Sequence, residues 1–182
     1  DSVLTTLLSA ARADTLEAKT LAARMARNAI DHLEAAATDG PGDVEPVALG
    51  DLRARIREGI GALPAPVRLV PTTTGSVRLP ASVADALASA ALQAAVNSVQ
   101  HAGDCDVSRW VSIEQQGQGM RVEGGDDGRG FDGAAIPAER LGVRRSIVER
   151  IATVDGHAEV HTAPGEGTRI VLTWSPAART TA

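Results

Sequence analysis

The sequence predicts an α+β protein: a two-layer α/β sandwich, with helices on one face of a mixed, mostly antiparallel sheet, preceded by an α-helical hairpin. Three observations support this fold class. The 182 residues are 43% hydrophobic but only 2% aromatic, so Leu, Val, Ile and Ala must fill the core, and abundant Ala favours helices. Segments of helical and strand periodicity are interleaved after residue 50. The last two strand-like segments flank "APGEG", which is typical of a hairpin turn.

The N-terminal segment, residues 1–37, is expected to form the helical hairpin. It has no Pro or Gly, and its apolar residues recur at helical spacing. Asp14 and the Thr that follows it suggest a new helix N-cap, which predicts two helices at about 2–12 and 15–37. Two helices cannot bury their apolar stripes alone, so we expect a helical bundle completed by a second chain.

A Gly-, Pro- and acid-rich stretch, residues 38–50, is expected to be a linker. The main domain then covers 51–177, and 178–182 form a tail. Pro80 is expected at the first helical position of the second helix in this domain. The expected helices lie at 51–61, 80–101 and 142–154, and the expected strands at 66–70, 109–116, 119–124, 157–162 and 167–174.

Composition excludes several classes of protein. A net charge of −5 argues against a nucleic-acid binder that neutralises phosphates. The single cysteine, Cys105, excludes a disulfide framework and a cysteine zinc cluster, so a reducing, cytoplasmic setting is expected. Neither a bilayer-spanning apolar run nor a signal peptide is found. The chain opens without Met, which suggests a fragment of a longer parent protein, and a membrane anchor of that parent stays open.

The helix expected at 80–101 carries an unusual polar arc. Gln93, Asn97, Gln100 and His101 gather beside its apolar face, and none is a charged acid or base of the kind that solvated faces use. Amide oxygens at this spacing suit a hydrated hard cation such as Mg²⁺ on a nucleotide. A solvated polar face is the alternative.

The stretch "DDGRGF" follows an expected strand. Gly128 and Gly130 let the backbone turn sharply and approach a flat ligand. Asp126 would then supply a carboxylate acceptor suited to the exocyclic amine of a purine. An Asx/Gly turn is the alternative. A calcium loop is disfavoured because the other EF-hand ligands are missing.

The helix that Gly142 opens favours an anionic ligand at its N-terminus. Thr168, which follows "GEG", could place a hydroxyl beside the same pocket. Nearby arginines suggest a small anion, with a solvated helix face as the alternative. These arginines are Arg140, Arg144, Arg145 and Arg150.

In this order, the segments resemble the nucleotide-binding boxes of the ATPase superfamily of gyrase, heat-shock chaperones, histidine kinases and mismatch-repair proteins (GHKL, with the Bergerat-type ATP-binding fold). "LQAAVNSVQHAG" resembles the N box, "DDGRGFD" the G1 box, "RLGVRRSIVERI" the G2 box and "GEGTR" the last G box. The resemblance covers about residues 45–175. It is greatest to the catalytic domains of bacterial sensor histidine kinases of the short-lid subfamily, whose phosphorylated His precedes an Asp.

The resemblance implies ATP or ADP as ligand and Mg²⁺ as cofactor. Asn97 would hold Mg²⁺, Asp126 the adenine amine, and Thr168 the adenine through water. A lid at 131–141 would begin at Phe131. The other implied nucleotide-binding residues are His101, Gly128 and Gly130 in the pocket wall, and Gly142 with Val143 at the phosphates.

The N-terminus resembles the phosphoacceptor helix of the same subfamily, just after its His. In "DSVLTT", Asp1 matches the acidic neighbour of that His and Thr5 the residue that assists dephosphorylation. The resemblance therefore implies a homodimer through the N-terminal helices, a response regulator receiver domain as partner, and a two-component phosphorelay. The reacting His is absent from this chain, so the fragment alone is expected not to phosphorylate itself.

One residue departs from the family pattern. The family usually has Glu four residues before the N-box Asn, and this chain has Gln93. An amide cannot activate water as a base, so Gln93 fits a kinase better than a free ATPase. The alternative is a degenerate GHKL binding or dimerisation module without kinase activity. An anti-sigma-factor serine kinase is disfavoured by the helical N-terminal hairpin.

Overall fold

The computed structural model describes residues 45–70, 75–103, 106–132 and 142–176. The chain divides into two compact units, Asp1–Val44 and Glu45–Ala182, and the described residues belong to the second. The helices predicted at 2–12 and 15–37, with Asp1 and Thr5, lie outside the described residues.

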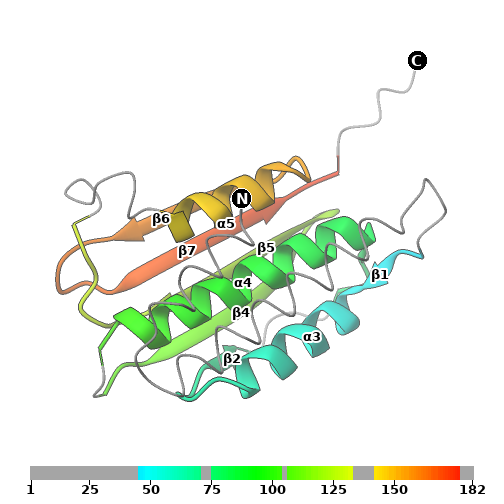
Figure 1. The fold of residues 1–182 in the computed structure, drawn as a ribbon. Coiled ribbons are helices and arrows are strands. Elements are labelled where there is room, and N and C mark those ends of the chain that lie inside the picture. The colour runs from blue at the N-terminus through cyan, green and yellow to red at the C-terminus, as the bar shows by residue number, and fades with distance from the viewer. Residues whose placement is uncertain (1–44, 71–74, 104–105, 133–141, 177–182) are drawn as a thin grey trace. The chain divides into compact units, whose positions relative to one another are not determined.

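The described unit is a two-layer α/β sandwich, and the predicted fold class is confirmed (Figure 1). The sheet has the strand order β2-β4-β5-β7-β6, in which β2 and β4 are parallel and all other neighbours antiparallel. The helices of the described residues cover one face of it. The strands are β2 (Arg68–Val70), β4 (Arg109–Gln116), β5 (Gly119–Asp126), β6 (His157–Thr162) and β7 (Thr168–Trp174), and the helices are α3 (Leu49–Gly61), α4 (Ala81–His101) and α5 (Gly142–Ala152).

The core lies between the sheet and the helices, with α4 at its centre. Along β4, Val111 and Ile113 are buried while Trp110 and Ser112, which alternate with them, are only half-buried, so one face of the strand meets the helices. Small side chains bring α4 close to the sheet, because a Cβ placed on Gly124 of β5 would lie 3.5 Å from that of Ala94. Among the described residues, no helix is long and apolar enough to cross a membrane.

The boundaries differ from prediction mainly at the start of the domain. Residues predicted as the end of a linker at 38–50 form β1 (Val47–Ala48) and the first turn of α3, because Leu49 packs into the core with 2% exposure. β1 pairs with β3 (Arg78–Leu79), and neither was predicted, since two residues carry no periodicity.

Pro80 was predicted at the first helical position, which is wrong. It is the N-cap of α4, and its carbonyl accepts hydrogen bonds from Val83 N and Ala84 N, both at 3.0 Å. β5 also continues two residues beyond the predicted strand at 119–124, to Asp126. Asp126, a predicted site residue, is therefore the last residue of a strand, and the hydrogen bonds to the neighbouring strands fix its position.

Candidate nucleotide site

Four polar side chains form a row at one end of the sheet. In the strand register, Arg109 is opposite Asp126, Asp126 opposite Thr168, and Thr168 opposite Thr162. Arg109 and Asp126 are only 8% and 4% exposed, whereas the two threonines are half-buried.

The next register row inward on the same face is apolar. It consists of Val111, Gly124, Ile170 and Val160. Because side chains alternate between faces, both rows face the helices. The end of the sheet thus combines a polar row with an apolar row, in which Val111, Gly124 and Ile170 are buried and Val160 is half-buried.

Helix α4 lies over these rows. Ala94 lies against Gly124, and Ala102, just past the end of α4, packs so tightly on Gly128 that a Cβ there would collide with it. Ser98 lies between Ala94 and Ala102 on the same side of the helix. It is 7% exposed, and its Oγ has no hydrogen-bond partner among the described residues.

Asp126 is a buried carboxylate that the described part of the chain satisfies only partly. Its Oδ1 accepts a hydrogen bond from Gly128 N at 3.1 Å, and no described cation pairs with it. A buried charge without compensation is costly. A ligand that donates a hydrogen bond to the second oxygen would therefore be stabilised there, as predicted for an exocyclic amine.

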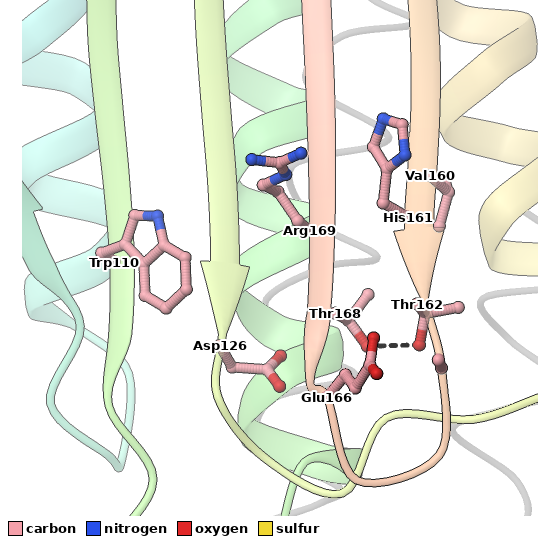
Figure 2. Close-up of a pocket in the computed structure, with 9 residues that line it drawn as sticks. Trp110, Asp126, Val160, His161, Thr162, Glu166, Thr168 and Arg169 are labelled. Atoms are coloured by element: carbon pink, nitrogen blue, oxygen red, sulfur yellow. Dashed lines mark hydrogen bonds between the residues drawn. The ribbon is translucent and has the colours of Figure 1, made fainter.

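A pocket of about 700 Å³ opens at this end of strands β4, β5, β7 and β6 (Figure 2). Of the predicted site residues, Asp126 and Thr168 line it, and the carboxylate of Asp126 points toward Thr168. Neither the N-box residues of α4 nor the G1 glycines line it. The remaining lining residues are Trp110, Val160, His161, Thr162, Ala163, Glu166 and Arg169.

The pocket extends around the end of the sheet. Trp110, Arg169 and His161 alternate with the polar row along their strands, so they belong to the face without helices. Trp110 lies against the side-chain-free Gly125, where an added Cβ would be 2.7 Å from its ring.

Gln93 and Asn97 form a hydrogen-bonded pair on α4. Gln93 Nε2 donates to Asn97 Oδ1 at 3.1 Å, and both residues are half-buried. The bond fixes the direction of the Asn97 amide and leaves Oδ1 a second lone pair. Within the described ranges, no group of three or more His, Cys, Asp or Glu could hold a metal ion. One oriented amide oxygen fits a cation that takes its other ligands from phosphates and water, as Mg²⁺ does.

His101 ends α4, and more than a third of it is exposed. Partial withdrawal of its ring from water and, second, the positive charge of Arg129 lower the pKa of His101 below its ordinary value of 6.5. The unfolded chain therefore binds a proton at His101 more readily than the folded chain does. The stability that neutral His101 contributes is fully present above pH 6.5 and declines as the pH falls below 6.5. The backbone N of Arg129 also donates to Ala102 O at 2.9 Å. This hydrogen bond connects the G1 loop, residues 126–132, to the end of α4.

Contacts within the protein require glycine at three positions of the G boxes, Gly128, Gly130 and Gly167. Gly130 and Gly167 have φ angles of +54° and +72°. A Cβ on Gly130 would collide with Ala163 O, and one on Gly167 with Asp126 O. The chain therefore folds tightly on itself here, and the predicted roles of Gly128 and Gly130 toward a nucleotide remain predictions.

The G2 segment is described only in part. Gly142 begins α5, as predicted. The side chains of residues 142–145, which include Val143, Arg144 and Arg145, lie outside the described part, as does Arg140.

The residues of this region that were not predicted include Ser98, Arg109 and Thr162. Helical periodicity from Ala94 could have placed the Ser98 hydroxyl on the buried face. Arg109 donates to Val107 O at 3.2 Å and Gly103 O at 2.8 Å, while its Nε has no partner within the described ranges. No pattern in the sequence signals this buried cation.

Comparison with known proteins identifies related chains. The family model for histidine kinase-, DNA gyrase B-, and HSP90-like ATPases matches residues 82–178, more than half of the chain, and includes all four predicted boxes. An uncharacterised sensor-like histidine kinase of Chloroflexus aurantiacus is 35% identical over 106 residues. That alignment covers 56% of this chain but only 17% of the relative.

Solved structures share the fold. The ATP-binding domain of PrrB from Mycobacterium tuberculosis matches with a TM-score of 0.51 and 24% identity, over 75% of this chain and 100% of that domain. The histidine kinase domain of the Erythrobacter litoralis EL346 blue-light activated kinase matches with a TM-score of 0.53 and 17% identity, over 94% and 93% of the two chains. Together with the family model, these relatives confirm the predicted resemblance to histidine kinase catalytic domains.

Proposed function

Because the chain belongs to the family of histidine kinase-, DNA gyrase B- and HSP90-like ATPases, we propose that it is the catalytic domain of a two-component sensor histidine kinase. It binds Mg-ATP and transfers the γ-phosphoryl group to a His, from which the group passes to an Asp of a response regulator receiver domain. The observation that carries the proposal is the buried, partly unsatisfied Asp126 carboxylate beside Thr168, in the pocket at the end of the sheet.

Adenine fits this arrangement of polar and apolar rows. Its ring would lie in the pocket at the end of the sheet, beside Val160 and the polar row. Its exocyclic amine would donate to Asp126, and Thr168 would contribute directly or through a water. The buried Ser98 hydroxyl on α4 also lacks a partner among the described residues, but Ser98 does not line the pocket.

Asn97 would hold Mg²⁺ through Oδ1, in the direction that Gln93 fixes. The bound cation would neutralise phosphate charge and orient the γ-phosphoryl group. The side chain of Gln93 donates a hydrogen bond to Asn97. Because it is an amide, it cannot act as a base that removes a proton from water. This favours transfer to a protein nucleophile over hydrolysis.

The transfer step requires a nucleophile that these residues do not supply. An imidazole nitrogen would attack the γ-phosphorus, the bond from that phosphorus to the bridging oxygen would break, and ADP would leave. The imidazole proton would pass to the neighbouring carboxylate, proposed to be Asp1, and Thr5 would assist dephosphorylation. Dimerisation through residues 1–37 would bring this helix to a catalytic domain.

Labelling with [γ-³²P]ATP tests the transfer. The present chain should bind ATP but remain unlabelled, because none of its four histidines is followed by an acid. A longer chain with a His directly before Asp1, and the helix leading into it, should acquire acid-labile label. A longer chain that binds ATP but stays unlabelled would favour the degenerate binding module.

Asn97→Ala should abolish the Mg²⁺ dependence of nucleotide binding. Removing the oriented oxygen should weaken Mg-ADP by on the order of tenfold or more, whereas ADP without metal should bind as before. Calorimetry with Mg²⁺ and with EDTA measures both affinities. Gln100→Ala, at an exposed position of the same helix, is the control and should keep the metal dependence. An unchanged response to Mg²⁺ in Asn97→Ala would remove Asn97 from the metal site.

A further inference from the structure

A single hydroxyl, that of Thr162 on β6, connects three parts of the site. Its Oγ1 accepts from Phe131 N at 3.1 Å, lies 2.9 Å from Gly167 O, and lies 3.3 Å from Thr168 Oγ1. It also lies 3.4 Å from Phe131 O. The G1 loop, the turn before β7 and the side chain of Thr168 therefore meet at one oxygen.

We infer that Thr162 determines which purine the pocket accepts, by fixing the direction of the Thr168 hydroxyl proton. This inference rests on the proposed nucleotide-binding function and assigns Thr162 as a positioning residue. Thr162 also lines the pocket, but its hydroxyl contacts Phe131 N, Gly167 O and Thr168 Oγ1, so we infer that it acts on the base through Thr168.

The proton count at Thr162 leads to this conclusion. A hydroxyl has one proton and two lone pairs. The N–H of Phe131 occupies one lone pair, and the proton goes to Gly167 O, which is the nearer of the two carbonyl oxygens. Gly167 is buried, so losing this donor would leave its carbonyl short of a partner. One lone pair of Thr162 then remains for Thr168, and in their 3.3 Å contact Thr168 is the donor.

Thr168 consequently presents lone pairs, and no proton, to the pocket. Figure 2 shows its hydroxyl joined to that of Thr162, with the Asp126 carboxylate pointing toward it. An ionised carboxylate is also an acceptor only. Two acceptors side by side select a ligand edge that donates, such as the 6-amino group of adenine. A 6-oxo purine donates only through its N1–H and would bring O6, a third acceptor, to the place where the 6-amino group of adenine donates, which leaves O6 unpaired.

The test compares ADP with IDP, whose base carries an oxygen at position 6. The wild-type chain should prefer ADP by on the order of 100-fold, because an unpaired buried acceptor is strongly rejected. Thr162→Val removes the hydroxyl with little change of shape and frees the Thr168 proton to turn toward the 6-oxo group. The ADP/IDP ratio of dissociation constants, measured by calorimetry, should then shift toward IDP by about tenfold.

Two controls isolate this effect. Thr162→Ser keeps the hydroxyl and should keep the wild-type ratio. Thr173→Val makes the same exchange on β7 at a position that does not line the pocket, and it should also leave the ratio unchanged. If Thr162→Val is unfolded by circular dichroism, Thr162→Ala is measured in its place.

A loss of affinity by the same factor for both nucleotides in Thr162→Val would overturn the inference, because it would show only a loosened G1 loop. If the wild-type chain binds neither ADP nor IDP, the proposed function fails instead. The two failures are therefore distinguishable.

Discussion

Asp126→Asn is expected to weaken ADP binding by about 100-fold, on the basis of the strength of hydrogen bonds to charged groups. The amide can retain the bond from Gly128 N through its oxygen. Its NH₂ group would then face the adenine amine, so that two donors meet where an acceptor is required. The fold should persist, because the substitution removes a buried charge that the described residues compensate only partly. Calorimetry and urea unfolding measure the two properties.

The neighbouring aspartate is the control for this change. Asp127 is exposed, and its Oδ1 accepts from Ser108 N at 2.7 Å in the loop after α4. Asp127→Asn makes the same chemical exchange one residue away and should leave ADP affinity within about twofold, as expected at a surface site. Equal losses in the two variants, or none in Asp126→Asn, would exclude Asp126 as the adenine acceptor.

Gly167→Ala should destabilise the domain by about 3 kcal/mol or more, since strained backbone and overpacking both contribute. Gly167 has a φ of +72°, and an added Cβ would collide with Asp126 O and lie 2.9 Å from Asp127 Cα. These are backbone atoms of the site, and they cannot rotate away. Urea unfolding of the variant measures the free energy.

Gly117→Ala separates strain from collision. Gly117, in the turn between β4 and β5, has a similar φ of +60°, but nothing lies within 4 Å of the added Cβ. It should cost only about 1 kcal/mol, the penalty for the left-handed conformation. If both variants lose the same free energy, the close packing of the last G box on β5 contributes nothing to stability.

Segments with strong periodicity could be predicted from the sequence. β4 and β6 have the predicted bounds, and α4 begins one residue after the predicted position, because alternating or helical apolar residues determine which face is buried. The polar arc of α4 also predicted that Gln93 and Asn97 share a side of the helix, and their hydrogen bond agrees with this.

Tertiary contacts account for what could not be predicted. Thr162 meets Phe131 across 31 positions of the chain, and Arg109 is buried among carbonyls of a loop with no periodicity. Gly128 and Gly130 were assigned to ligand access, but the described structure shows that neighbouring backbone also requires glycine at both positions. A sequence shows where Cβ atoms are missing and does not show which atoms occupy the space.

The indole of Trp110 against Gly125 also gives the domain an optical reporter. The chain contains two Trp and no Tyr, so its near-ultraviolet emission comes almost entirely from these two rings. Trp110 lines the pocket, whereas Trp174 pairs with Met120 at the opposite end of the β5–β7 ladder. One fluorophore therefore lies at the nucleotide site and the other at the far end of the same sheet. With Trp174 replaced by Phe, a single intrinsic emitter would observe the pocket without any attached dye.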